Sequence, residues 1–172
     1  MKPGARISAA IEVLDTIVNR HQPVAIALSD WGKAHRFAGS GDRNAIGGLV
    51  YDALRRRSSI AWAMGADTPR ALAIGAASNA FRMSAGEVLA ACDGAAHAPD
   101  ALSETEREGL TRSLDQAPDH IRADVPEWLW PSFVSAFGAN AVVEGQRLAE
   151  RAPADLRVNT LKATQEKVLK AL

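Results

Sequence analysis

The sequence predicts an all-α fold for its first 150 residues, followed by a short strand-helix fragment that begins an α/β subdomain. Three observations lead to this prediction. Apolar residues recur at helical spacing, pairs of residues typical of helix N-termini recur along the chain, and the only long alternating pattern is at residues 156–161. We therefore expect a helical bundle over residues 1–150 and the start of a second region over residues 151–172.

Apolar stripes predict the first three helices. The stripes are Ile7, Ile11, Leu14 and Val18; then Val24, Leu28, Trp31 and His35; then Ile46, Leu49, Val50, Ala53 and Leu54. Pro23 suits the first position of the second helix, because the backbone N–H that proline lacks would have no hydrogen-bond partner within the helix there. Gly47 and Gly48 each cost roughly 1 kcal/mol relative to alanine in the third helix. We expect a neighbouring helix to approach closely at these two glycines.

Capping residues mark the start of the next helices. Thr68 before Pro69 has the order of an N-cap and a first helical residue, which predicts a helix to about Asn79. Two further pairs have capping-box spacing, namely Ser84 with Glu87 and Ser103 with Glu106. Apolar residues between 128 and 148 predict two short helices, separated near residues 138–140.

The composition is that of a globular chain in a reducing compartment. Apolar residues make up 47% of the sequence, and no apolar run approaches the roughly 18 residues that cross a membrane. The N-terminus lacks the apolar core of a signal peptide. The single cysteine, Cys92, excludes an internal disulfide. We therefore expect a cytoplasmic protein with no membrane partner.

The net charge of zero conceals an uneven distribution. Residues 1–82 hold 11 Lys and Arg against 6 Asp and Glu, whereas residues 83–172 hold 9 against 14. A basic first half is compatible with nucleic-acid binding, although proteins that bind no nucleic acid also show differences of this size.

The C-terminal stretch predicts a change of structure. Residues 156–161 alternate as a strand, and Thr164 is placed as the N-cap of an amphipathic helix. A lone strand leaves its edges unpaired and needs a sheet to join. We therefore interpret the sequence as a piece of a longer protein. Residues 153–172 are expected to be mobile or to borrow packing from the bundle or from a neighbouring chain.

The sequence lacks the common catalytic signatures. It has neither a Gly-x-Gly-x-x-Gly segment after a strand nor a Walker lysine loop, and its four histidines share no ligand spacing with Cys92. We expect no catalytic residue, no metal and no cofactor within this chain. A stand-alone small enzyme is therefore a weak third possibility for its function.

Two basic groups are candidates for RNA binding. Arg55, Arg56 and Arg57 end the third predicted helix, where they could fan around a phosphate backbone, and Arg43 begins it. The alternative is a solvated helix end whose cations favour the helix dipole.

The second group lies on the polar face of the predicted C-terminal strand. There Arg157 can pair with phosphate or stack on a base, Asn159 can read a base edge, and Lys162 and Lys167 can extend the surface. The alternative for this group is an ordinary polar strand face.

Four segments, in order, resemble the RsmB/Sun family of S-adenosylmethionine-dependent RNA cytosine-5 methyltransferases. Along the chain they are the arginine-rich stretch at 42–57, Val-Pro-Glu-Trp-Leu-Trp at 125–130, Phe-Val-Ser-Ala-Phe at 133–137, and Pro-x-x-Leu-Arg-Val-Asn-Thr at 153–160. The resemblance implies a NusB-like helical bundle followed by the entry to an RNA-binding subdomain. It also implies that the catalytic cysteine and the S-adenosylmethionine site belong to a domain outside these residues, so Cys92 is interpreted as a structural thiol.

The sequence thus predicts the RNA-binding N-terminal region of a ribosomal RNA cytosine-5 methyltransferase. Its expected partner is small-subunit ribosomal RNA, which it would position for the catalytic domain. The alternative function is a NusB-like protein-interaction module whose basic helix docks an acidic protein and does not bind RNA.

Overall fold

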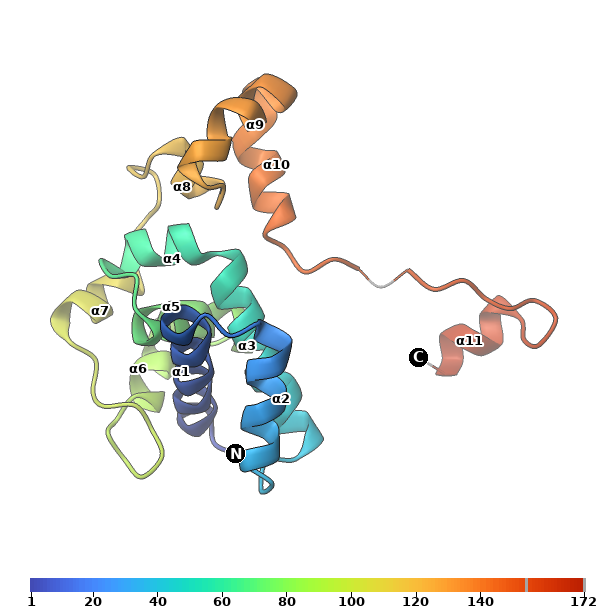
Figure 1. Cartoon of the computed structure of the whole chain (residues 1–172), viewed down its shortest axis with the longest axis horizontal. Helices are drawn as coiled ribbons and strands as arrows, with labels where there is room; N and C mark the ends of the chain where they lie inside the picture. The colour runs from blue at the N-terminus through green and yellow to red at the C-terminus, as the bar shows by residue number, and fades with distance from the viewer. Residues whose placement is uncertain (154, 172) are drawn as a thin grey trace.

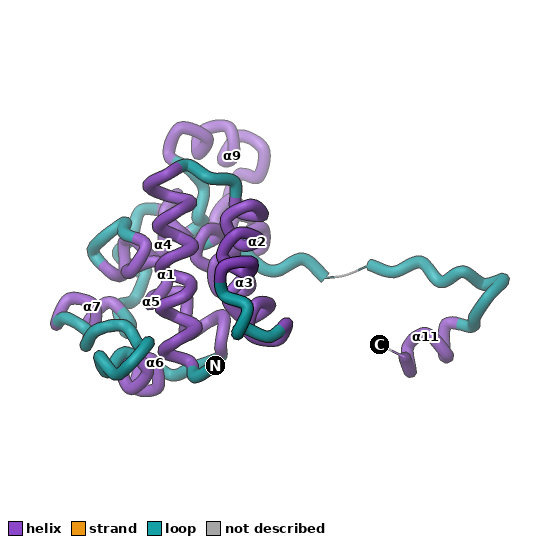
Figure 2. Tube along the Cα trace, turned by 60° about the horizontal axis from the view of Figure 1, so that its bottom comes forward, coloured by secondary structure: helices purple, strands orange, loops and turns teal. Residues whose placement is uncertain are grey.

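The computed structural model describes residues 1–153 and 155–171. These residues are largely helical and contain no β-strand, so the predicted all-α bundle is confirmed for them (Figures 1 and 2). The bundle contains α1 (Pro3–Arg20), α2 (Val24–Ala34), α3 (Ser40–Arg55), α4 (Arg57–Met64), α5 (Pro69–Phe81), α6 (Ala85–Ala91) and α7 (Glu104–Gly109). A small lobe contains α8 (Asp119–Arg122), η1 (Glu127–Leu129), α9 (Trp130–Phe137), η2 (Gly138–Asn140) and α10 (Ala141–Leu148). Helix α11 (Gln165–Ala171) follows on an extended tail. Among the helices described, none combines the length and apolar character that a bilayer crossing requires.

The centre of the bundle is made by α1, α3 and α5, with α4 packed against α5. The predicted stripes supply its core, because Ile7, Leu14, Ile46 and Leu49 are fully buried. Helix α5 consists mainly of small and apolar residues, which lets other helices pack closely around it. At Gly75, an added Cβ would lie 2.5 Å from a methyl carbon of Ile60 on α4.

Local sequence signals determine where three helices begin. The Thr68 hydroxyl accepts a hydrogen bond from the Ala71 N–H at 3.2 Å, as expected of the N-cap of α5. Ser84 and Glu87 form the predicted capping box at α6, and Ser103 and Glu106 form the one at α7. The predicted pair of short helices near residues 128–148 corresponds to α9 and α10, with η2 between them.

The expectation for Gly47 and Gly48 is not met. An added Cβ at Gly47 would meet only Leu28, at an ordinary contact distance of 3.8 Å, and one at Gly48 would meet nothing within 4 Å. No neighbouring helix therefore requires glycine at these positions. The two glycines instead leave open space beside α3.

The prediction that one helix carries Arg55, Arg56 and Arg57 is also corrected. Helix α3 ends at Arg55, Arg56 leaves the helical conformation, and Arg57 begins α4. No proline or glycine marks this break in the sequence. It is stabilised instead by a carboxylate from the small lobe.

That carboxylate is Asp124, which caps the N-terminal turn of α4. Asp124 accepts hydrogen bonds from the backbone N–H of Ser59 at 2.8 Å and from the Ser59 hydroxyl at 2.7 Å. Its backbone adopts the left-handed conformation, with φ of 52°. Burial raises the pKa of Asp124, although the hydrogen bonds from Ser59 and the charge of Arg56 oppose this effect. Asp124 thus joins the small lobe to the bundle.

The C-terminal tail departs from the predicted strand-helix fragment. Residues 155–159 have no regular secondary structure. The Asn159 carbonyl then accepts from the N–H groups of Lys162 and Ala163, both at 3.0 Å, which closes a turn. A strand needs a partner edge, and the described residues offer none. Helix α11 does form, with the Thr164 hydroxyl at 3.4 Å from the Lys167 N–H in the expected N-cap position.

One ion pair fixes the long connector after α6 to the bundle. The Arg70 Nε donates to Glu106 at 2.7 Å, and the Arg70 Nη2 donates to the Asp100 carbonyl at 2.9 Å. Burial opposes ionisation of Glu106, but hydrogen bonds from Arg70 and Ser103 outweigh it and lower the pKa of that carboxyl.

We expect Arg70→Ala to lower the free energy of unfolding by about 2 kcal/mol, since it leaves a largely buried carboxylate without its charged donor. Because folding lowers the pKa of Glu106, its contribution is present above the unfolded pKa and is lost as the pH falls through the folded value. Urea unfolding at neutral and acidic pH measures both effects. The control is Arg112→Ala, which breaks a more exposed pair with Glu108 and should cost less than about 1 kcal/mol. Equal losses in the two variants would contradict this account.

Candidate nucleic-acid interface

A groove lies between α2 and α3 and contains two of the predicted RNA-binding residues. Arg43 and Arg55 line it from the two ends of α3, and Arg151 joins them from the start of the tail. The groove encloses about 840 Å³. We call it the α2–α3 groove. Figures 1 and 2 both show the two helices side by side.

The charge of the groove is predominantly positive. Of the described residues that line it, three are arginines, and one, Asp52, is a carboxylate. Arg55 forms an ion pair with Asp52, which also accepts from the Asn79 side chain at 3.3 Å. Arg43 donates from Nε to the Ala38 carbonyl at 2.8 Å, which fixes the guanidinium at the mouth of the groove. Two positive charges therefore remain in excess along its length.

The groove also offers an aromatic ring and an amide. Tyr51 is 43% exposed and lies one turn before Arg55 on α3, while Asn44 follows Arg43. Gly47 and Gly48 lie between these groups and project no side chain into the space. The result is an open channel with cations near both ends of α3 and a ring available for stacking.

The other two arginines of the predicted cluster do not line the groove. Arg57 makes two hydrogen bonds to the carboxylate of Asp67, at 2.8 and 2.9 Å, and these bonds raise its pKa. Arg56 lies beside Asp124, and its Nε is buried with no hydrogen-bond partner among the described residues. The structure therefore separates the triplet: Arg55 lines the groove, Arg57 pairs with Asp67, and Arg56 lies near Asp124.

The tail residues form a separate group. Arg157, Asn159 and Lys162 are all exposed, and they lie on the segment that leads to α11 (Figure 1). The Asn159 side chain accepts from the Leu161 N–H at 3.1 Å, which engages its oxygen in the turn. The structure does not place these three residues in the α2–α3 groove.

Cys92 has the surroundings of a structural thiol. It ends α6 and is 1% exposed, and burial raises its pKa to about 11. A cysteine with this pKa is protonated at neutral pH and is a poor nucleophile. Within the described part of the chain, no three His, Cys, Asp or Glu side chains gather as metal ligands would.

Sequence reasoning missed Arg151, Tyr51 and Asn44 as members of the site. Asn44 and Tyr51 are seven residues apart, and thus lie on one face of a helix, so the periodicity of α3 could have indicated them. Arg151 comes from about 100 residues away in the chain, and nothing in the sequence indicates its position.

Comparison of the chain with protein-family models, with curated proteins and with solved structures finds no match.

Proposed function

We propose that this chain binds single-stranded segments of RNA in the α2–α3 groove. The observation that carries the proposal is the meeting of Arg43, Arg55 and Arg151, from separate segments, beside an exposed tyrosine. Arginine pairs with phosphate oxygens through two parallel donors, and an aromatic ring stacks on any base. Single-stranded RNA presents both groups at once, because its bases are free to leave the stack.

The wider role that we propose follows the sequence resemblance. The chain would be the NusB-like N-terminal region of an S-adenosylmethionine-dependent ribosomal RNA cytosine-5 methyltransferase, acting in the cytoplasm. Its task would be to position small-subunit ribosomal RNA for a catalytic domain that lies outside these residues and holds the methyl donor. The support for this role is the ordered set of short motifs, together with a helical bundle of the expected class.

The experiment is a binding titration of labelled single-stranded RNA, and of small-subunit ribosomal RNA, with the whole chain. The groove variant is Arg43→Ala with Arg55→Ala and Arg151→Ala. A matched tail variant, Arg157→Ala with Lys162→Ala and Lys167→Ala, removes the same charge from the second predicted surface. We expect the groove variant to lose most of the affinity and the tail variant to retain it.

Two results would redirect the assignment. Loss of binding in the tail variant alone would place the RNA on the tail surface. Absence of RNA binding at low salt by the folded chain would favour the protein-interaction module.

A further inference from the structure

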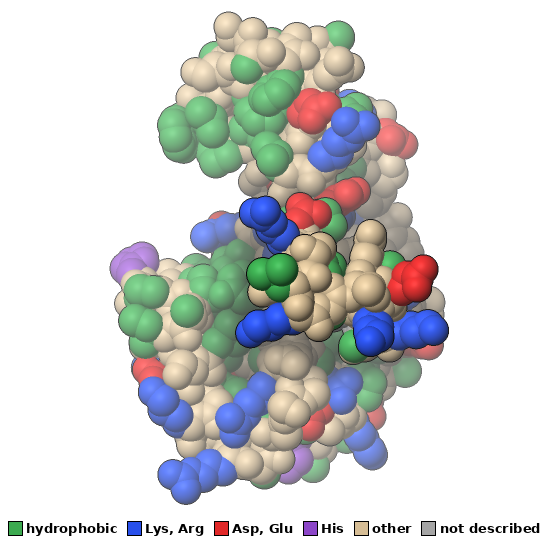
Figure 3. All heavy atoms as spheres, turned by 90° about the vertical axis from the view of Figure 1, so that its right-hand side faces the viewer, with side chains coloured by type: hydrophobic (Ala, Val, Ile, Leu, Met, Phe, Trp, Pro, Cys, Tyr) green, Lys and Arg blue, Asp and Glu red, His purple; other side chains and the backbone are tan. Residues whose placement is uncertain are grey.

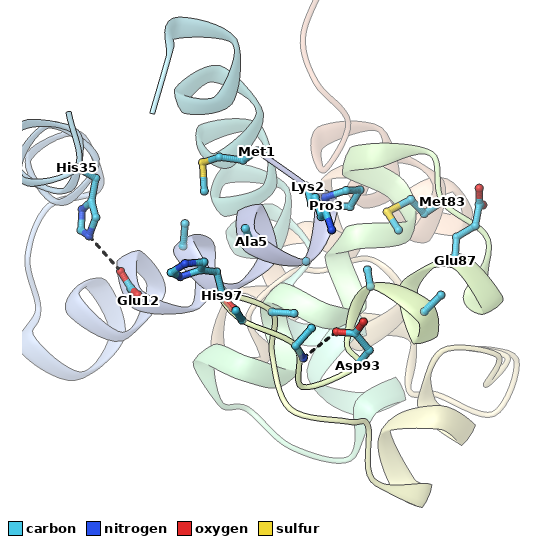
Figure 4. Close-up of a pocket in the computed structure, with 18 of the residues that line it drawn as sticks. Met1, Lys2, Pro3, Ala5, Glu12, His35, Met83, Glu87, Asp93 and His97 are labelled. Atoms are coloured by element: carbon cyan, nitrogen blue, oxygen red, sulfur yellow. Dashed lines mark hydrogen bonds and ion pairs between the residues drawn. The ribbon is translucent and has the colours of Figure 1, made fainter. Parts of the chain in front are cut away.

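A second hollow on the bundle lies between α1, α6 and the end of α2 (Figure 4). It encloses about 1200 Å³, which exceeds the roughly 300–1000 Å³ typical of small-molecule sites. Its lining is largely apolar and includes Ala5 and Ala9 of α1, Ala90 and Ala91 of α6, and the flexible side chains of Met1 and Met83. We call it the α1–α6 groove. Small residues along its walls would let a helix approach closely, as in helix-in-groove recognition.

An aromatic wall borders this groove at the end of α2. Trp31 and His35 stack with ring centroids 4.3 Å apart, and His35 meets Phe37 edge-on at 5.7 Å. Phe37 is 73% exposed. An exposed ring beside an apolar groove is suited to packing against an incoming side chain.

Carboxylates surround the apolar floor. Glu12, Glu87 and Asp93 line the groove, and the opposing charges among the described lining residues are Lys2 and the N-terminal ammonium of Met1, which is paired with Asp42. Figure 4 places Glu12 and Glu87 at opposite ends of the view. Hydrogen bonds from the Ser84 backbone and hydroxyl lower the pKa of Glu87, so it is ionised at neutral pH. These charges repel phosphate groups and nucleic acid, and they favour an occupant that is both apolar and cationic.

The tail of this chain has that chemistry. Leu161 is 96% exposed and Leu169 on α11 is 65% exposed, while Lys167 and Lys170 flank the apolar residues of the helix. Figures 1 and 2 both place α11 apart from the bundle. The tail thus carries exposed leucines and lysines, and the bundle carries an open apolar groove with carboxylates around it.

We propose that α11 of one copy docks in the α1–α6 groove of a second copy, and that the exchange is reciprocal. Leu169 and Leu161 would pack on the alanines and methionines, and the lysines would face Glu12 and Asp93. The 16 residues between Leu148 and Gln165 reach about 50 Å when extended, which sets how far α11 can lie from the end of α10. Reciprocal exchange closes a two-fold dimer, so no open filament results. This proposal is independent of RNA binding in the α2–α3 groove.

Light scattering of the whole chain over a range of concentrations tests the proposal with two charge reversals. The tail reversal is Lys167→Glu with Lys170→Glu, and the groove reversal is Glu12→Lys with Asp93→Lys. Each variant alone sets like charges against each other in both contacts of the dimer. We expect each reversal to weaken dimerisation about tenfold or more. An equimolar mixture of the two variants restores opposite charges in both contacts, so it should dimerise as the unaltered chain does.

The control for the groove reversal is Glu127→Lys with Glu150→Lys, which makes the same charge change outside the groove and should leave dimerisation unchanged. Circular dichroism confirms that every variant is folded. A chain that stays monomeric at all concentrations would overturn the proposal, and so would a mixture that stays monomeric.

Figure 3 shows apolar side chains gathered on the small lobe. Dimerisation that is abolished by Trp128→Ala with Phe137→Ala, and is insensitive to the charge reversals, would assign the interface to that face instead.

Discussion

Replacing Asp124 with alanine is expected to lower the free energy of unfolding by about 3 kcal/mol. The loss has three sources: a side-chain acceptor for the first turn of α4, worth roughly 0.5–2 kcal/mol as a helix cap is; the unpaired donors of Ser59, at about 1–3 kcal/mol; and a left-handed backbone that alanine adopts at a cost of roughly 1–2 kcal/mol. Since these terms overlap, the total is below their sum. Urea unfolding followed by circular dichroism measures it.

Two further substitutions separate the sources. Asp124→Gly accepts the left-handed backbone freely, so it should be about 1 kcal/mol less damaging than alanine. Asp124→Asn keeps one acceptor for Ser59 and also tolerates this backbone, so it should cost less than about 1 kcal/mol. Equal losses for the alanine and asparagine variants would show that the hydrogen bonds to Ser59 do not stabilise the contact between the lobes.

The pH dependence of stability provides a separate test of Asp124. Burial raises the pKa of Asp124 on folding, so the part of the stability that is linked to its proton is fully present below the unfolded pKa and is lost as the pH rises through the folded value, while the carboxylate continues to accept from Ser59. The asparagine variant has no proton to lose and should lack this decline. If the decline persists in Asp124→Asn, another group is responsible for it.

The groove variant, with Arg43, Arg55 and Arg151 all replaced by alanine, is expected to bind single-stranded RNA about a hundredfold more weakly. This estimate takes about 1 kcal/mol for each lost contact, the net value of a typical hydrogen bond. Arg55→Ala also leaves Asp52 without its cation, which adds a negative charge to the groove. The dependence of log affinity on log salt should become shallower by about 2, because each lost phosphate contact on a single strand contributes roughly 0.7.

A blocking substitution tests the same groove without removing charge. Gly48→Leu places a side chain in the open space between the cations, where nothing lies within 4 Å of an added Cβ. We expect it to reduce RNA affinity and to keep the chain folded, because leucine is the better helix former. Gly48→Ala is the control and should bind nearly as well as the unaltered chain. Undiminished binding by Gly48→Leu would exclude this part of the groove as the RNA site.

The sequence predicts features that depend on a few neighbouring residues. The caps at Thr68, Ser84 and Ser103 form as expected, because an N-cap bonds to backbone only two or three residues away. The core positions of α1 and α3 also follow from spacing along one helix. These local signals are sufficient to predict a helical bundle.

Features that depend on distant residues were not predictable in this way. The break at Arg56 is stabilised by Asp124, whose partner Ser59 is 65 residues away in sequence. Arg151 reaches the α2–α3 groove from beyond the small lobe, and the glycines of α3 border that groove and not a neighbouring helix. The alternating pattern over residues 156–161 is compatible with a β-strand. A strand forms only where it can pair with the edge of another strand, and the pattern gives no information about such a partner.

The most direct test of the α2–α3 groove is nuclear magnetic resonance of the arginine Nε–Hε groups during titration with single-stranded RNA. We predict that the resonances of Arg43, Arg55 and Arg151 shift together with one affinity. Those of Arg57 and Arg70, which are held by Asp67 and Glu106, should stay in place and serve as internal controls. Shifts confined to Arg157, or binding of RNA with no change at the three groove arginines, would contradict the assignment.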